Sequence, residues 1–189
     1  IKIPSGEINN LPYLKVLAKQ KKKLILSTGM STLSEVKNAI RVLRSKGLKK
    51  NNLYVLHCHS DYPSKPENLN LKAIGLLERK IGLNVGYSDH SVGIEAPIIA
   101  VAYGAKIIEK HITLNKNYYG PDHRASLEPQ EFKTMVDSIR ITEKMIGTSL
   151  KTPSKIELKN RKLVRKSIVA FKDIKKGEKF STNNITTKR

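Results

Sequence analysis

Residues 23–47, KLILSTGMSTLSEVKNAIRVLRSKG, contain one strand and one helix, and this pairing decides the fold class. The run Leu24–Leu26 is continuously apolar, which is typical of a parallel strand buried on both faces. Thr32 and Glu35 have the spacing of a capping box, and Gly47 is suited to end the helix that follows. Apolar residues at three- and four-residue spacing between these signals predict an amphipathic helix.

The same alternation of strand and helix signals recurs through the first 150 residues. We expect strands at residues 1–5, 23–28, 53–58, 84–90 and 107–113, and helices at residues 10–20, 32–47, 69–81, 94–104 and 128–146. Five strands that alternate with helices predict a parallel α/β fold.

Two architectures fit this pattern, an open doubly wound sheet and a (β/α)8 barrel. The chain contains neither the G-x-G-x-x-G sequence of dinucleotide-binding sheets nor a phosphate-binding P-loop. A barrel instead assembles its site from polar residues at the carboxyl ends of its strands, and it needs eight strands. The five expected strands all end in such residues: Ser5-Gly-Glu7, Ser27-Thr-Gly29, His57-Cys-His59, Ser88-Asp-His90 and Glu109-Lys-His111. Either the sheet is open, or three strands precede residue 1.

The charge of the chain is unevenly distributed. The formal net charge is +20, and residues 151–189 carry 13 Lys and Arg against three Asp and Glu. This composition marks the last 39 residues as a separate region and suggests an anionic partner, either nucleic acid, a membrane surface or a phosphorylated substrate. Nucleic acid is a poor match, because few aromatic residues accompany the basic ones.

The compartment is indicated by two features of the composition. The single cysteine, Cys58, excludes a disulfide framework and fits a reducing cytosol, so we expect a cytoplasmic protein. No apolar run reaches the ~18 residues that a membrane span needs, so we expect no membrane association.

Two histidines, His90 and His111, follow consecutive expected strands and should be neighbours in space. Asp89, Glu109 and Asp122 offer carboxylate oxygens nearby. Imidazole is the commonest metal ligand in proteins, so the arrangement is compatible with a site for Mn²⁺, Mg²⁺, Fe²⁺ or Zn²⁺, and spacing alone does not choose among them. The alternative is that each histidine only caps a strand end or bonds a loop carbonyl.

Hydroxyl and amine groups on the first two strands are candidates for binding a phosphate. Lys2, Ser5 and Ser27 lie there with the backbone N–H groups of the turn that follows, and Glu7 could act as a base or accept sugar hydroxyls. The alternative is a solvated lysine with ordinary turn hydroxyls. We expect Cys58 to be a buried, unreactive thiol.

Taken together, several strings in the chain resemble the sialic acid synthase family, the enzymes that condense phosphoenolpyruvate with sugars to form nonulosonic acids. The similarity covers almost all 189 residues in the right order. The strings are Lys2-Ile-Pro-Ser-Gly-Glu7, Leu26-Ser-Thr-Gly-Met30, Leu56-His-Cys58, Asp61-Tyr-Pro63, Gly86-Tyr-Ser-Asp-His90, Glu109-Lys-His-Ile-Thr113, Gly120-Pro-Asp-His-Arg-Ala-Ser126, Arg165-Lys-Ser-Ile-Val169 and Asp173-Ile-Lys-Lys-Gly-Glu178.

The resemblance implies a domain organisation. Residues 1–149 would be strands four to eight of a (β/α)8 TIM barrel, residues 150–163 a linker, and residues 164–189 the start of an antifreeze-like (SAF) domain. We therefore expect the chain to be a fragment that is inactive by itself, and the full-length enzyme to be a domain-swapped homodimer.

The resemblance also implies a reaction and a set of site residues. Phosphoenolpyruvate would condense with an N-acetylmannosamine-type sugar and release phosphate by C–O cleavage, with Mn²⁺ or Mg²⁺ as a Lewis acid that polarises the sugar aldehyde. His90 and His111 would hold the metal. Phosphoenolpyruvate would be bound by Lys2, Ser5, Ser27 and Ser60, the last of which is Asn in the relative compared. The sugar would be bound by Glu7, Tyr62 and Asp122, and by Arg189 reaching into a partner subunit.

The string Gly120-Pro-Asp-His-Arg-Ala-Ser126 is more similar to synthases of sialic or legionaminic acid than to those of pseudaminic acid. Two other hypotheses stay open on the sequence. The chain could be a catalytically silent fragment that binds nucleic acid or another anion, or a different metal-dependent enzyme of the aldolase type.

Overall fold

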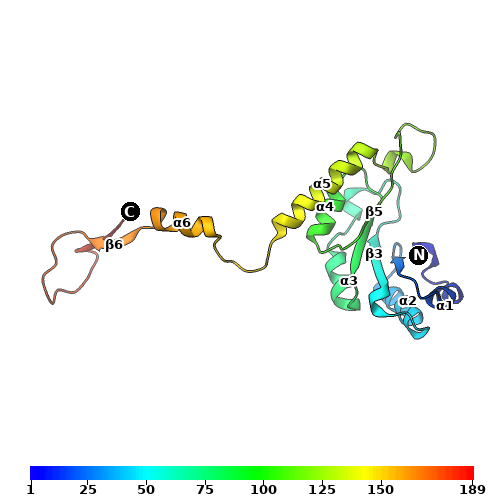
Figure 1. The fold of residues 1–189 in the computed structure, drawn as a ribbon, viewed down its shortest axis with the longest axis horizontal. Helices are drawn as coiled ribbons and strands as arrows, with labels where there is room; N and C mark the ends of the chain where they lie inside the picture. The colour runs from blue at the N-terminus through cyan, green and yellow to red at the C-terminus, as the bar shows by residue number, and fades with distance from the viewer. The chain divides into compact units, whose positions relative to one another are not determined.

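The computed structural model describes residues 1–189 and divides into two compact units, Ile1–Gly147 and Thr148–Arg189 (Figure 1). The first unit contains a five-stranded parallel sheet in which the strands lie in the order β1-β2-β3-β4-β5. The strands are β1 (Lys2–Ile3), β2 (Leu24–Ser27), β3 (Leu53–Cys58), β4 (Val85–Asp89) and β5 (Ile108–Lys110). The helices are α1 (Leu11–Ala18), α2 (Leu33–Ser45), α3 (Ala73–Ile81), α4 (Glu95–Ala102) and α5 (Pro129–Ile146).

The α2 unit forms as its sequence predicts. The Thr32 hydroxyl accepts a hydrogen bond from the Glu35 backbone N–H, while the Glu35 carboxylate accepts one from the Thr32 N–H, so both halves of the capping box are present. The apolar stripe of the helix is buried, and Gly47 takes a positive φ of 94° just beyond the helix end.

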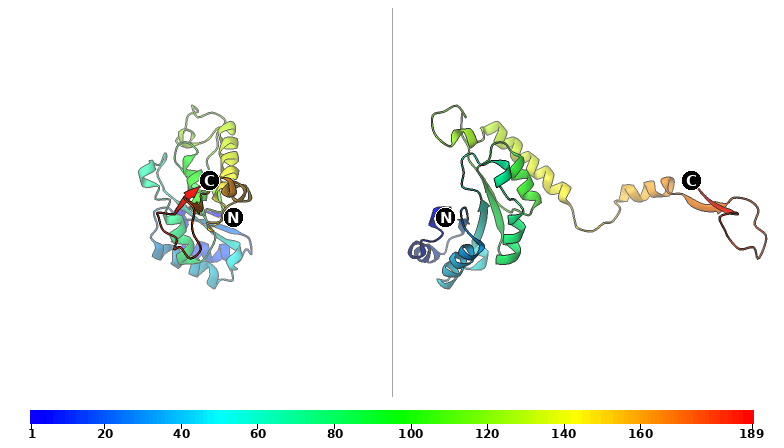
Figure 2. Two further views of the ribbon diagram at one scale, coloured as in Figure 1. Left: turned by 90° about the vertical axis from the view of Figure 1, so that its left-hand side faces the viewer. Right: turned by 180° about the vertical axis from the view of Figure 1, so that it is seen from behind.

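The hydrophobic core lies between the sheet and its helices. Register and alternation place Ile3, Leu26, Val55, Val85 and Tyr87 on one face, and all five are buried. The helices run along this outer face, as Figures 1 and 2 show. The opposite face of the sheet, here called the inner face, carries the strand side chains that do not pack against the helices.

The inner face of the sheet is concave. The same register puts Lys2, Ser27, Cys58, Ser88 and Glu109 on this face, from all five strands. Strands β1 and β5 would be about 19 Å apart in a flat sheet with ~4.8 Å between neighbours. The Lys2 amine nevertheless lies 2.6 Å from a Glu109 oxygen, so the sheet curls strongly enough to bring its first and last strands together.

The strand order also distinguishes the two architectures that the sequence left open. A doubly wound sheet reverses its order at a switch point, whereas here each new strand is added on the same side as the one before. The first unit is thus an α/β fold with a curled parallel sheet.

The second unit contains helix α6 (Lys155–Val164) and an antiparallel pair of strands, β6 (Ser167–Ala170) and β7 (Ile185–Lys188). Sequence reading did not identify α6, although Ser154 and Glu157 form a complete capping box at its start. The Asn184 side chain is buried and donates to Glu178 and to the Lys179 carbonyl, which closes the loop between the strands. None of the helices in either unit has both the length and the apolar character that crossing a membrane requires.

Candidate functional site

Two histidine rings meet at the carboxyl ends of β4 and β5, where the sequence predicted a metal site. His90 directly follows Asp89, the last residue of β4, and His111 directly follows Lys110, the last residue of β5. The ring centroids are 5.5 Å apart and the planes are perpendicular. Because β4 and β5 are hydrogen-bonded neighbours, residues that follow their ends are held side by side.

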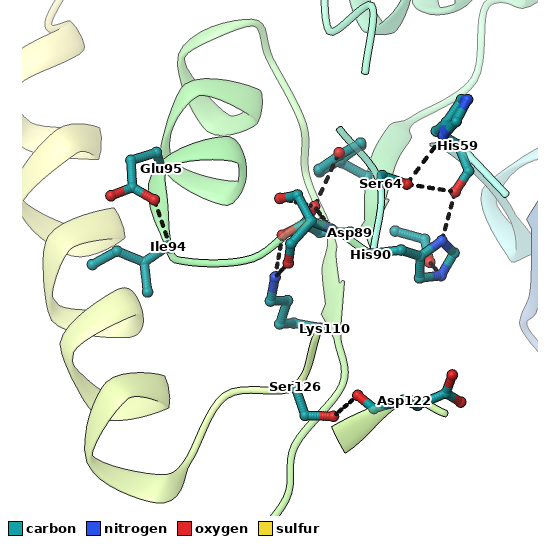
Figure 3. Close-up of polar contacts among 12 residues, drawn as sticks. His59, Ser64, Asp89, His90, Ile94, Glu95, Lys110, Asp122 and Ser126 are labelled. Carbon is teal, nitrogen blue, oxygen red and sulfur yellow. Dashed lines mark hydrogen bonds and ion pairs between the residues drawn. The ribbon is translucent and has the colours of Figure 1, made fainter. Parts of the chain in front are cut away.

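The tautomer of His90 follows from its partners. Its Nδ1 lies 2.6 Å from the backbone oxygen of His59, which can only accept, so Nδ1 carries the proton (Figure 3). The lone pair is therefore on Nε2, 3.1 Å from the Tyr62 hydroxyl. Burial lowers the pKa of His90, partly offset by the bond to His59, and this keeps the ring neutral.

His111 is more exposed and faces a carboxylate. Its Nδ1 lies 3.7 Å from Asp122 Oδ2, and the Tyr62 ring centroid lies 5.8 Å from its own. Asp122 belongs to the loop between β5 and α5, which is held by a 2.7 Å hydrogen bond between Thr113 and His123. His90, His111, Tyr62 and Asp122 are therefore brought together.

The arrangement fits a divalent metal with open coordination positions. A neutral imidazole whose Nδ1–H is bonded to a carbonyl, with its lone pair on Nε2, is the usual form of a metal-ligating histidine. His90 has this form, although its Nε2 accepts from the Tyr62 hydroxyl and a metal would have to displace that bond. His111 offers a second ring, but no three His, Cys, Asp or Glu side chains converge as a complete ligand set. The donors suit a metal that keeps positions for water or substrate rather than a closed structural site.

Lys2 is not a free amine, because Glu109 binds it. Its Nζ donates to both Glu109 oxygens, at 2.6 and 2.8 Å, and the Ser88 hydroxyl donates to the same carboxylate at 2.7 Å. Burial raises the pKa of Glu109, but the hydrogen bonds from Lys2 and Ser88 outweigh it, so the pKa lies below its usual value. The carboxylate is charged and ties β1 to β5 across the inner face.

The hydroxyls of Ser5 and Ser60 both lie next to Gly29, near the ends of the first three strands. The Gly29 N–H donates to the Ser5 hydroxyl at 2.9 Å, and the Ser5 oxygen lies 3.3 Å from the Cys58 sulfur. A Cβ on Gly29 would lie 2.1 Å from the Ser60 hydroxyl oxygen and 2.9 Å from that of Ser5. Gly29 is therefore needed for the close approach of these two hydroxyls.

Ser27 contains the one buried side-chain polar atom in the chain that has no hydrogen-bond partner. The residue is 3% exposed and lies at the end of β2, on the inner face. A buried hydroxyl without a protein partner is costly, so the Ser27 hydroxyl is available to an ordered water, an ion or a ligand.

One sequence-predicted residue of the first unit, Glu7, has its side-chain hydrogen bond outside this cluster. Glu7 lies in a short 3-10 turn, Ser5–Glu7, and its carboxylate accepts a hydrogen bond from the Asn10 side chain at 2.7 Å. Arg189 belongs to the second unit and is exposed.

No role was predicted from the sequence for Ser88, which binds Glu109, or for Lys110. The sequence predicted Asp89 and Glu109 as nearby oxygen donors, but Glu109 binds Lys2, and Asp89 pairs with Lys110 on the opposite face of the sheet. Their position in the sequence could have identified them, because each lies within two residues of His90 or His111, in the strings Ser88-Asp-His90 and Glu109-Lys-His111.

Comparison with known proteins gives a match to one family. Residues 1–151 match the NeuB family. The N,N'-diacetyllegionaminic acid synthase of Campylobacter jejuni is 56% identical over 188 residues, which is all of this chain and 56% of that protein. The human N-acetylneuraminate-9-phosphate synthase is 37% identical, over 99% of this chain and 52% of that protein. The chain therefore spans about half the length of the curated relatives it matches.

A solved structure supports the same relationship. The N-acetylneuraminic acid synthetase of Leptospira borgpetersenii, crystallised with citrate, superposes with a TM-score of 0.77 at 37% identity. The superposition covers 86% of this chain and 57% of that one. The curled five-stranded sheet of the first unit is thus a fold found in a sialic acid synthetase.

Proposed function

Since the chain belongs to the NeuB family of sialic acid synthases, we propose that its protein condenses phosphoenolpyruvate with an N-acetylated amino sugar to form a nonulosonic acid and phosphate. The observation that carries the proposal is the inner face of the sheet. Two neighbouring imidazoles and a group of amine and hydroxyl donors converge there, at the carboxyl ends of all five strands.

The donors at the ends of β1, β2 and β3 suit phosphoenolpyruvate. We propose that Lys2, Ser5, Ser27 and Ser60 bind its phosphate and carboxylate. The Ser27 hydroxyl has no hydrogen-bond partner in the protein, so binding an anion would not require it to break an existing bond. This supports including Ser27 among the residues that bind phosphoenolpyruvate. Lys2 is held by Glu109, so its charge is already oriented towards the inner face before substrate binds.

The residues at the ends of β4 and β5 suit the sugar. We propose that Tyr62, Asp122 and Glu7 bind the acceptor, and that His90 and His111 hold Mn²⁺ or Mg²⁺. When bound, the metal would act as a Lewis acid on the aldehyde carbonyl of the open-chain sugar.

The proposed reaction joins C3 of phosphoenolpyruvate to the aldehyde carbon of the sugar. The π electrons of the enol form the new C–C bond, a proton is taken up by the former aldehyde oxygen, water adds at C2, and the C2–O bond to phosphate breaks. The protein holds the two substrates in line and keeps Lys2 beside the departing anion. We propose that the Tyr62 hydroxyl, which lies 3.1 Å from His90 Nε2, would donate a hydrogen bond where charge develops on the sugar.

We propose that the first unit is the strand-four-to-eight part of a (β/α)8 barrel, residues 1–149. Its edge strands β1 and β5 are both unpaired on one side and curl towards each other. The 189-residue chain by itself would then show no turnover, because open edges leave the site incomplete. Residues 150–163 would form a linker and residues 164–189 the start of a SAF domain, whose Arg189 would reach a partner subunit's site in a domain-swapped homodimer.

The acceptor is proposed to be a diacetamido sugar rather than N-acetylmannosamine. The supporting observation is that the identity to a legionaminic acid synthase is 56%, against 42% for a pseudaminic acid synthase and 37% for an N-acetylneuraminate-9-phosphate synthase.

The test is an assay of the full-length protein with each acceptor, with phosphoenolpyruvate carrying ¹⁸O in its bridging oxygen and with added Mn²⁺. We expect a nonulosonic acid by mass spectrometry and phosphate that contains the label, since C–O cleavage sends the bridging oxygen away with phosphate. Unlabelled phosphate, or no condensation with either acceptor, would contradict the proposal.

A further inference from the structure

An ion pair that the proposed chemistry does not use lies behind the two histidines. Asp89 and Lys110 are partners in the register of β4 and β5, one step before His90 and His111. The Lys110 amine lies 2.6 Å from Asp89 Oδ2, and both side chains are 0% exposed (Figure 3). Since Ser88 and Glu109 lie on the inner face, alternation places Asp89 and Lys110 on the opposite face.

The Asp89 carboxylate accepts four hydrogen bonds, three at Oδ1 and one at Oδ2. Its Oδ1 accepts hydrogen bonds from the Tyr87 hydroxyl at 3.1 Å, from the Ser91 N–H at 3.0 Å and from the Ser91 hydroxyl at 2.7 Å. Its Oδ2 accepts from Lys110, which also donates to the Ser91 backbone oxygen. Hydrogen bonds reach both carboxylate oxygens from three different residues, so the position of the carboxylate is closely determined.

The network holds the chain on both sides of His90. Residue 89 is one member of the ion pair, and residue 91 is bonded to both members, so the backbone at residue 90 is held from each side. Lys110 immediately precedes His111, so the same ion pair also fixes the position of the backbone from which the His111 ring projects. The hydrogen bond from the Lys110 amine to the Asp89 carboxylate therefore links the two strand ends that carry His90 and His111.

From this geometry we infer that Asp89 and Lys110 are positioning residues, whose buried ion pair holds His90 and His111 at the separation that binds a divalent metal. The inference rests on the function proposed above. A buried ion pair adds little net stability compared with apolar side chains of the same size. Its hydrogen bonds are directional, however, so it specifies distances that apolar packing leaves adjustable.

The test compares Mn²⁺ binding with folding in the full-length protein. The double variant Asp89→Asn/Lys110→Met removes both charges, keeps similar volumes and leaves an amide oxygen to accept from Tyr87 and Ser91. We expect the unfolding temperature of the metal-free protein to stay near that of the wild type. We expect the Mn²⁺ dissociation constant, measured by calorimetry, to rise about 10- to 100-fold, as when groups that orient metal ligands are lost.

The matched control is the exposed ion pair Lys133–Asp137 on α5. Lys133→Met/Asp137→Asn makes the same chemical change at an exposed pair that contacts neither histidine, and we expect Mn²⁺ affinity to be unchanged. Wild-type affinity in the Asp89→Asn/Lys110→Met variant would overturn the inference. Should that variant fail to fold, Lys110→Arg keeps the charge while changing its reach. Weaker Mn²⁺ binding by folded Lys110→Arg would support the inference, and unchanged binding would overturn it.

A further variant separates this inference from the proposed function. His90→Ala removes a proposed ligand and should itself abolish tight Mn²⁺ binding. If wild-type protein and His90→Ala bind Mn²⁺ equally, the proposed metal site is wrong. If His90→Ala loses binding while the pair variants do not, only the positioning role is wrong.

Discussion

The two adjacent hydroxyls of Ser27 and Thr28, at the end of β2, differ in whether they have a hydrogen-bond partner. Substituting each in turn distinguishes an effect on substrate binding from an effect on stability. Both Ser27 and Thr28 are buried, but Thr28 donates a 2.9 Å hydrogen bond to the Leu56 backbone oxygen while the Ser27 hydroxyl has no partner. A satisfied buried hydroxyl contributes to the free energy of unfolding, whereas an unsatisfied one subtracts from it. The two residues therefore form a natural pair of variant and control.

We predict that Ser27→Ala raises the KM for phosphoenolpyruvate and leaves the free energy of unfolding equal to or slightly above the wild-type value. Thr28→Val should instead lower that free energy by about 1 kcal/mol, since it loses a made hydrogen bond. Denaturant titration and steady-state kinetics of the full-length protein measure both effects. An unchanged KM in Ser27→Ala would show that this hydroxyl does not bind the substrate.

Gly29 is needed because of a close approach rather than an unusual backbone angle. In Gly29→Ala the new methyl group would overlap the Ser60 hydroxyl, so Ser60 and Ser5 must rotate away. We predict a loss of about 1 kcal/mol, the value of the hydrogen bond from the Gly29 N–H to Ser5, and a higher KM for phosphoenolpyruvate.

The control is Gly6→Ala, where a Cβ would meet nothing within 4 Å. Both variants are measured by the same denaturant titration and kinetics. Equal behaviour of the two variants would mean that the Gly29 cluster tolerates extra volume and does not order these hydroxyls.

At the scale of elements, His57 links β3 to the segment that leads into α3. It points to the outer face, where its Nε2 lies 2.8 Å from the Leu69 backbone oxygen and its ring stacks on Tyr87. Burial lowers the pKa of His57, and the hydrogen bond to Leu69 offsets only part of this effect. The folded protein therefore holds His57 as a neutral ring.

This linkage predicts acid sensitivity of the first unit. Above pH ~6.5, the usual pKa of histidine, His57 is neutral in both states and has no effect. As the pH falls below that value, the unfolded chain binds a proton that the folded protein binds only at lower pH, so the free energy of unfolding falls. In His57→Gln, whose amide can donate to Leu69, we expect a smaller drop between pH ~7.5 and ~5.5.

Denaturant titration of the metal-free protein at the two pH values measures this difference. The result that contradicts the assignment is an identical drop in wild type and His57→Gln, which would place the acid sensitivity in other groups.

The ends of the elements were less predictable than their existence. All five strands and five helices of the first unit lie within or close to the expected ranges. The strand expected at 107–113 ends at Lys110, because Ile112 pairs with Leu127 in the following loop and leaves the sheet. The helix expected from residue 69 begins at Ala73, because Asn70 takes a positive φ of 45°, outside the range of a right-handed helix. The first shift comes from a partner distant in sequence and the second from the backbone of a single residue.

At the scale of the whole molecule, the chain is divided near residue 148. Residues 148–154 form neither helix nor strand, and Lys151 is the only Lys or Arg among them. The match to the NeuB family also ends at residue 151. Composition had already separated residues 151–189 by their excess of positive charge.

Limited digestion with trypsin is expected to cut first after Lys151, because the residue is exposed and its backbone lies outside regular structure. Mass spectrometry should identify residues 1–151 as the first large product. Lys151→Gln is the control and should delay its appearance. Earlier cleavage inside residues 1–147 would show that the first unit opens more readily than the segment that follows it.

Local chemistry in the chain is enough to specify the alternation of strands and helices and the polar strand ends, since hydrophobic periodicity and capping act between near neighbours. It also pointed to His90 and His111 as neighbours. The tertiary structure was needed to show that the sheet curls and that Lys2 binds Glu109. It also showed that the Ser27 hydroxyl lacks a partner and that Asp89 pairs with Lys110. These features join residues up to 107 positions apart, and only packing of the whole sheet sets such distances.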